Sequence, residues 1–157
     1  MRLNGRVTHR DRAPAPSLLY VVKQLELVTR AHLDAIVRES GVTALQYTAL
    51  TVLERREGMT SADLARHSFV RAQSAADLVG GLERRGLIRR DPDPANRRRR
   101  LISLTDEGRA LLRRQAEPVA ALEAHMLKDL DPDQRESFAE ALQLCRGAMS
   151  DLPLDAD

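Results

Sequence analysis

The chain has 157 residues, of which 43% are hydrophobic and 31% charged, and its formal net charge is +2. This length suits one domain with a hydrophobic core, or a small domain extended by dimerisation helices. Only 3% of the residues are aromatic and Trp is absent, which disfavours the base-stacking surfaces of single-strand nucleic-acid binders. A single cysteine, Cys145, excludes an internal disulfide and fits a reducing compartment.

The N-terminal segment, residues 1–16, is polar and basic and ends in Pro14-Ala15-Pro16. It lacks the apolar stretch of a secretory signal, so we expect a flexible basic arm. No apolar run approaches the roughly 20 residues that cross a bilayer. We therefore expect a soluble, cytoplasmic protein with no membrane partner.

Residues 17–41 predict a first helix, with Ser17 as its N-cap and Gly41 near its end. Apolar residues recur at helical spacing, but Leu19 and Leu27 point away from the main stripe. A helix that is apolar on several sides predicts that a second subunit covers part of it. We therefore assign this segment to dimerisation.

Residues 42–104 predict a DNA-binding lobe. A helix is expected over 43–56, and Thr60 with Asp63 forms a variant of the capping box at the start of a short helix over 61–67. A turn at residues 68–70 leads into a fourth helix, 71–85. Two helices joined by so tight a turn are typical of a helix-turn-helix, in which the second helix reads the DNA.

The segment 84–104, RRGLIRRDPDPANRRRRLISL, predicts a two-stranded ribbon. A first strand runs into a Pro- and Asp-rich turn, and Arg97 to Arg100 precede a second short strand at 101–104. Eight Arg against two Asp give this stretch a net charge of +6, which leaves −4 for the rest of the chain. An arginine run alone is also compatible with a solvated surface turn. Its place beside a helix-turn-helix favours contact with DNA phosphates.

Residues 105–150 predict two further helices, beginning at Thr105 and at Asp131-Pro132. From Thr105 onward the chain holds twelve acidic and six basic residues, a net charge of −6. We assign these helices to dimerisation, away from phosphate, and we expect residues 151–157 to form an acidic tail.

Three motifs resemble the MarR family of winged-helix regulators: GVTALQYTALTVL (Gly41–Leu53), TSADLARH (Thr60–His67) and LERRGLIRRDPDPANRRRRLISLTDEGRALL (Leu82–Leu112). The resemblance implies a mainly α fold with a small two-stranded β wing, dimeric through its N- and C-terminal helices. It also implies a homodimer that binds pseudo-palindromic double-stranded DNA, usually as a repressor. In many members a small aromatic or phenolic effector, or an oxidant, weakens DNA binding.

Several residues are candidates for DNA contact. Exposed positions near the start of the fourth helix face the major groove in this geometry, where Gln pairs with adenine, Arg with guanine and Ser with either. Thr60 and Ser68 are candidates for phosphate contact or caps. In the resemblance, Arg97 and Arg98 match the wing arginines. The full set of candidates is Arg71, Gln73, Ser74, Asp77, Thr60, Ser68, Arg97, Arg98 and Arg99.

Two positions depart from the family pattern. Asn96 stands where the family usually has Asp before the wing arginine, and Asp77 stands where the recognition helix often has Arg. In relatives that Asp–Arg pair ties the wing to the helix. We therefore hypothesise that Asp77 pairs with Arg97 or Arg98, with the charges reversed.

An effector pocket would lie between the dimer helices and the DNA lobe. Candidate lining residues are Tyr20, His32, Gln46 and Tyr47, which are equally compatible with core or interface positions. Cys145 is interpreted as an inert buried thiol, with a redox-responsive repressor as an alternative. The four histidines have no metal-ligand spacing, no cofactor is indicated, and no catalytic motif predicts an enzyme.

The sequence also allows an effector-independent winged-helix protein, used for DNA organisation or protein contact. Preference for a specific operator would separate the two readings, because such an organiser should bind all duplexes similarly.

Overall fold

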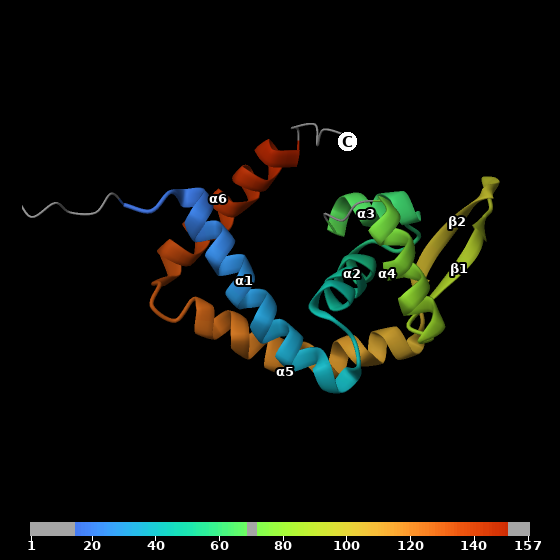
Figure 1. Cartoon of the computed structure of the whole chain (residues 1–157), viewed down its shortest axis with the longest axis horizontal. Coiled ribbons are helices and arrows are strands. Elements are labelled where there is room, and N and C mark those ends of the chain that lie inside the picture. Colours follow the sequence, from blue (N-terminus) through green and yellow to red (C-terminus); the bar gives the residue numbers. More distant parts are fainter. Residues whose placement is uncertain (1–14, 69–71, 151–157) are drawn as a thin grey trace, which may run out of the picture.

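The computed structural model describes residues 15–68 and 72–150 (Figure 1). The N-terminal arm up to residue 14 and the acidic tail, 151–157, lie outside these ranges. The elements in chain order are α1 (Leu18–Val37), a 3-10 turn η1 (Arg38–Ser40), α2 (Ala44–Arg55), α3 (Ser61–Ser68), α4 (Ala72–Arg84), β1 (Ile88–Asp93), β2 (Asn96–Leu104), α5 (Asp106–Met126) and α6 (Pro132–Ser150). The mainly helical fold with one small antiparallel sheet is therefore confirmed.

The helix starts follow from local capping chemistry. The hydroxyl of Ser17 accepts from the Tyr20 amide at 3.2 Å, and Thr43 forms a full capping box with Gln46. At the start of α3, Thr60 and Asp63 exchange hydrogen bonds at 3.2 Å in the predicted variant of this motif. Each cap satisfies amide groups that the first helical turn leaves without partners.

The hydrophobic core lies in the lobe formed by α2, α3, α4, the root of the two strands and the start of α5. Side chains from all of these elements are fully buried, including Leu50, Leu53, Leu64, Leu82, Ile102, Leu104 and Leu111. The root of the ribbon is joined to the chain before α3 by two backbone hydrogen bonds, Ile102 N to Met59 O at 2.7 Å and Gly58 N to Ile102 O at 3.1 Å. The ribbon is therefore anchored in the core at one end.

The strands are longer than the sequence predicted. The structure continues β1 through Pro92 to Asp93, and β2 already begins at Asn96, so the arginine run lies within a strand and not in a turn. The expectation that the second strand starts at Leu101 was wrong. Cross-strand pairing, such as Pro92 with Arg100, extends the ladder beyond the apolar residues.

The start of α5 is tied to the ribbon root. The Thr105 side chain donates to Gly86 O at 2.6 Å, and the Thr105 amide donates to Leu87 O at 3.1 Å. At Gly108, a β-carbon would overlap the carbonyl oxygen of Leu87. Glycine is therefore required at position 108, where α5 crosses the residue that precedes β1.

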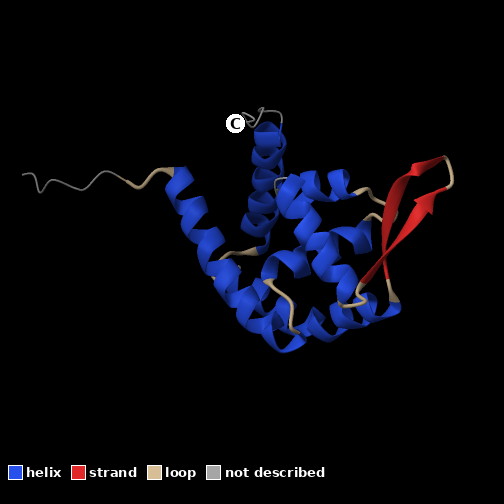
Figure 2. Cartoon of the chain, turned by 45° about the vertical axis from the view of Figure 1, so that its right-hand side comes forward, coloured by secondary structure: helices blue, strands red, loops and turns tan. Residues whose placement is uncertain are grey.

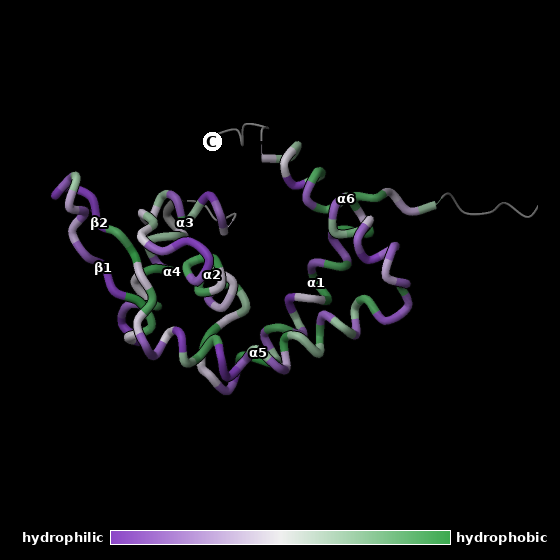
Figure 3. Tube along the Cα trace, turned by 180° about the vertical axis from the view of Figure 1, so that it is seen from behind, coloured by the Kyte–Doolittle hydropathy of each residue, from purple (hydrophilic) through white to green (hydrophobic). Residues whose placement is uncertain are grey.

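Helices α1 and α5 run alongside each other away from the lobe, and α6 turns back from the far end of α5 (Figure 1). Many apolar side chains on these helices are exposed in the single chain, with 82% of Leu18, 77% of Leu19 and 75% of Leu144 accessible. Figure 3 shows hydrophobic stretches on α1 and α6 beyond the lobe. Each helix in the described ranges is too short or too polar to span a bilayer.

Candidate nucleic-acid interface

The ribbon projects from the lobe beside α4, with its hairpin end free of the helices (Figure 2). In hydropathy this end is among the most hydrophilic parts of the chain (Figure 3). A helix and a cationic ribbon projecting from one lobe form the geometry by which winged helices contact a groove and the neighbouring backbone.

Helix α4 buries one face and exposes the other. Ala75, Leu78, Val79 and Leu82 are buried, whereas Ser74 and Asp77 are exposed. This spacing of three and four residues is that of an amphipathic helix on a core. Ser74 and Asp77 are therefore available to a partner. Arg71 and the side chain of Gln73 lie outside the part of the chain that the structure describes.

The hypothesis that Asp77 pairs with Arg97 or Arg98 was wrong. Among the described residues no ion pair joins Asp77 to the ribbon. An ion pair between Glu83, near the end of α4, and Arg90 on β1 connects the two elements instead. Glu83 lies close to the ribbon root in sequence and in space, whereas the arginine run lies on the exposed part of the ribbon.

The arginines of the ribbon differ in their partners. Arg89 pairs with Asp91 at 2.9 Å, Arg90 pairs with Glu83, and Arg99 lies 3.8 Å from Asp93. The remaining three members of the arginine run lack an acidic partner within the described ranges: Arg97, Arg98 and Arg100. Positive charge therefore remains uncompensated along β2.

Two polar side chains near the turn shape the backbone. The carboxylate of Asp93, whose side chain is only 12% exposed, accepts from the Ala95 amide at 2.8 Å. The Asn96 side chain accepts from the Arg98 amide at 3.1 Å. These local side-chain contacts are typical of tight turns and hold the start of the arginine run in strand geometry.

Of the two hydroxyl candidates, Thr60 is engaged in a helix cap and Ser68 is buried. Thr60 caps α3, and its hydroxyl donates to the Asp63 carboxylate at 2.6 Å. This bond lowers the pKa of Asp63 below its ordinary value. Ser68 is the last residue of α3 and is 8% exposed, so its hydroxyl does not face solvent in this conformation. Among the described residues its oxygen has no hydrogen-bond partner.

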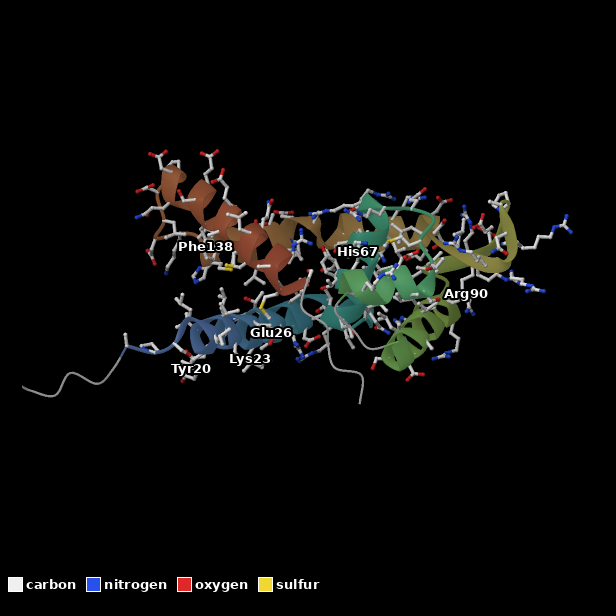
Figure 4. The ribbon with its side chains drawn as sticks, turned by 90° about the horizontal axis from the view of Figure 1, so that it is seen from above. Tyr20, Lys23, Glu26, His67, Arg90 and Phe138 are labelled. Atoms are coloured by element: carbon white, nitrogen blue, oxygen red, sulfur yellow. The ribbon has the colours of Figure 1, made fainter. Side chains whose placement is uncertain are left out.

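The four candidate effector residues do not come together. Tyr20 is exposed near the start of α1, at the opposite end of the view from Arg90 (Figure 4). Gln46 completes the α2 capping box, and Tyr47 is a core residue whose pKa is raised by burial. His32 alone of the four lines a hollow of about 720 Å³ between α1 and α5.

That hollow is largely apolar. Its lining residues are Leu25, Val28, Thr29, His32 and Leu33 from α1, with Val119, Leu122, Glu123, His125 and Met126 from α5. Its size falls in the range of small-molecule pockets, about 300–1,000 Å³. It lies between the two long helices, farther from the lobe than the sequence predicted.

Two contacts between different elements were not predicted from the sequence. The first is the Glu83–Arg90 pair. The second is a pair of hydrogen bonds at Ser40, called here the Ser40 joint: the Ser40 carbonyl accepts from Arg85 at 3.1 Å, and the Ser40 hydroxyl accepts from Gln115 at 2.8 Å. The joint links the end of α1 to the segment after α4 and to α5. Both features connect residues that are charged or polar in the sequence and carry no periodic signal.

Cys145 is exposed in the single chain, contrary to the buried thiol that the sequence predicted. Its position on α6, which buries no residue along its described length, accounts for the difference. Across the described ranges no group of three or more His, Cys, Asp or Glu is arranged to hold a metal ion.

Comparison with known proteins identifies the family. A model of the MarR family matches residues 40–99. The HTH-type transcriptional repressor Rv2887 of Mycobacterium tuberculosis is 32% identical over 133 residues, which cover 85% of this chain and 94% of the relative. The transcriptional regulator HosA of Escherichia coli O111:H- is 28% identical over 109 residues, which cover 69% of this chain and 78% of HosA.

Solved structures share the fold. The repressor CouR bound to a 23-mer DNA duplex superposes with a TM-score of 0.74 at 27% identity, covering 83% of this chain and 92% of CouR. Rv2887 of M. tuberculosis in complex with p-aminosalicylic acid superposes with a TM-score of 0.67 at 28% identity, covering 83% and 98%. Because the similarity to Rv2887 extends over most of both chains, this chain belongs to the MarR family of winged-helix transcriptional regulators, which are not enzymes.

Proposed function

We propose that the protein is a homodimeric repressor that binds a pseudo-palindromic operator in double-stranded DNA and leaves it when a small aromatic ligand binds. The observation that carries the proposal is the ribbon that projects beside α4: three arginines of β2 lack an ion-pair partner in the described chain, and α4 exposes a polar face. CouR, which has the same fold, is a repressor bound to a DNA duplex.

In this proposal α4 reads bases in the major groove. Exposed Ser74 serves as a hydrogen-bond donor or acceptor for base edges, and Asp77 accepts from the amino group of cytosine. Arg71 and Gln73, in or next to the first turn of α4, read guanine and adenine. Thr60 lies at the start of α3, where a contact with a phosphate is proposed to fix the position of the lobe, whereas the buried Ser68 is not assigned a phosphate contact.

The ribbon contacts the backbone and the adjacent minor groove. Arg97 and Arg98 carry full positive charge without an acidic partner in the described chain, so they attract phosphates or a narrow A·T-rich minor groove. Arg99 is a weaker candidate because Asp93 lies 3.8 Å away and offsets part of its charge.

The homodimer is proposed to form through α1 and the C-terminal helices. A second copy would shield the exposed apolar side chains of α1 and α6 from water. Two lobes related by a twofold axis would then reach half-sites about 34–36 Å apart, one turn of DNA.

The hollow between α1 and α5 is the proposed effector site. Apolar side chains surround it, and His32 and His125 offer hydrogen bonds to a carboxylate or phenol. Support comes from Rv2887, whose structure holds p-aminosalicylic acid. Ligand entry would alter the spacing of the two helices and thereby the distance between the lobes.

A titration of the purified protein against its own promoter region and against random duplex tests DNA recognition. We expect a preference of at least about 10³-fold at the same salt concentration. Arg97→Ala with Arg98→Ala removes four arginines from each dimer, so it should weaken operator binding and reduce the salt slope by about four units, one for each phosphate that is no longer neutralised. Arg113→Ala with Lys128→Ala removes the same number of positive charges at positions that lie outside the ribbon, and it should leave the salt slope unchanged.

Equal affinity for all duplexes would overturn the repressor proposal, and so would an unchanged slope in the ribbon variant. Effector release is tested by adding p-aminosalicylic acid to the protein–promoter complex. We expect dissociation for the wild type and none for Val28→Trp, whose larger side chain fills the hollow. Dissociation of both proteins alike would place the effector elsewhere.

A further inference from the structure

The ion pair between Glu83 and Arg90 connects the recognition helix to the wing. Of the ion pairs among the described residues, it alone joins α4 to the ribbon. Both side chains are about two-fifths exposed, at 37% and 40%, so the contact lies at the edge of the lobe and not in its core. Figure 4 shows Arg90 beside the helices of the lobe, where the ribbon leaves it.

The register of the ribbon shows which arginines face the lobe. Arg90 is paired with Ile102 and Pro92 with Arg100, and residues two apart on a strand share a face. Ile102 is fully buried against the lobe. Arg90 and Arg100 therefore lie on the lobe-facing side of the ribbon, and Arg99 lies on the other side.

Glu83 forms an ion pair with Arg90, and its carboxylate also feels the charge of Arg100, with which it forms no ion pair. The hydrogen bond from Arg90 lowers the pKa of Glu83, and the positive charges of Arg90 and Arg100 lower it further. The carboxylate therefore stays ionised across the physiological range and attracts both strands.

Contact with the lobe ends at this level of the ribbon. Ile88 and Ile102 are buried at the root of the ribbon. On β1 beyond Ile88, the buried residue is Asp93, and its carboxylate accepts a hydrogen bond within the hairpin turn. An isolated two-stranded ribbon is marginally stable in water. The angle between the ribbon and α4 therefore depends on the Glu83–Arg90 pair, which is the contact with α4 farthest from the root.

We propose that Glu83 is a positioning residue for DNA recognition, which sets the angle between the wing and α4 by holding Arg90. This inference rests on the proposed function. With the angle set, the wing arginines meet the backbone at a fixed distance from the bases that α4 contacts. Without it, the wing still binds phosphate but no longer in register with the operator.

Removal of the Glu83 carboxylate should change the affinity for the operator in the opposite direction from the one that its charge alone predicts. Glu83 is an acid beside a DNA-binding surface, so its removal should strengthen binding to every duplex if charge alone mattered. A positioning role predicts the opposite for the operator, since the contacts of α4 and the wing no longer coincide. Glu83→Gln, which keeps the shape of the side chain, separates the two effects.

We expect Glu83→Gln to weaken binding to the native promoter by about three- to tenfold, because each dimer on the operator loses two exposed ion pairs. Affinity for random duplex should stay equal or rise. Asp91→Asn, which breaks the Arg89–Asp91 pair within β1, is the matched control and should not reduce the preference. The reversed pair, Glu83→Arg with Arg90→Glu, should restore it.

Promoter and random-duplex affinities are measured by fluorescence anisotropy at one salt concentration, with amide exchange of the β1–β2 ladder as a structural readout. Faster exchange beyond Arg90 in Glu83→Gln, together with a reduced preference, supports the inference. Undiminished preference in Glu83→Gln would overturn it, as would failure of the reversed pair to recover the loss. A wild type without preference would instead refute the proposed function.

Discussion

The DNA lobe and the long helices outside it use their apolar residues in opposite ways. In the lobe, Leu50, Leu53 and Leu64 are completely inaccessible to water. On α1 and α6, Leu19 and Leu144 remain more than 70% exposed. The lobe therefore completes its core within one chain, whereas the helices present an apolar surface that water disfavours. The folding stability of the lobe should therefore not require a second subunit, whereas that of α1 and α6 should depend on association.

The largest expected effect is in the lobe core. Leu53→Ala removes a fully buried side chain from α2 and should lower the free energy of unfolding by about 2–5 kcal/mol, since a cavity remains. Urea unfolding measures this loss. Glu54→Ala, at the adjacent exposed position, should change stability by less than about 0.5 kcal/mol. A similar small change for Leu53→Ala would contradict the view that the lobe core is self-contained.

The second effect concerns association. Leu19→Glu places a charge on the apolar surface of α1 and should raise the subunit dissociation constant at least about tenfold, because an unpaired carboxylate would be buried. Sedimentation equilibrium measures the constant, and circular dichroism should show unchanged helix content. Leu19→Met keeps the surface apolar and should remain associated. A Leu19→Glu protein that associates as tightly as the wild type would show that α1 is not in the interface.

The smallest effect is the acid sensitivity of the α3 cap. The Thr60 hydroxyl lowers the pKa of Asp63 from its ordinary value of 3.8 in the folded protein. A lowered folded pKa contributes stability above pH 3.8 that is lost as the pH falls through the folded value. Asp63→Asn should therefore flatten the decline in stability below about pH 4, measured by thermal unfolding. An identical decline in both proteins would show that this carboxylate does not contribute.

Most of the fold could be predicted because its signals are local. Caps at Ser17, Thr60 and Thr105 mark helix starts through hydrogen bonds within four residues, and Gly41 ends the first helical segment with a φ of 69°. Periodic apolar residues then place the buried faces. Such signals depend on neighbours in the sequence and need no knowledge of the tertiary structure.

The site was less predictable because it depends on contacts between distant elements. Nothing near Asp77 in the sequence shows that Glu83 holds the wing instead, and four adjacent arginines resemble a turn until the pairing of Pro92 with Arg100 places them in a strand. Tyr47 resembled a ligand group, yet the packing of α2 buries it in the core. Pairing register and burial are properties of the whole fold.

The close approach at Gly108 has a mechanical consequence. Because α5 meets the Leu87 carbonyl there without room for a side chain, the helix and the ribbon root cannot slide past each other. α5 has 21 residues and is about 30 Å long, and the contact with the ribbon root lies in its first turn. A tilt of the first turns of α5 should therefore move the hairpin, whereas Pro118 in the middle of α5 lacks a backbone N–H and is a point at which the helix can bend.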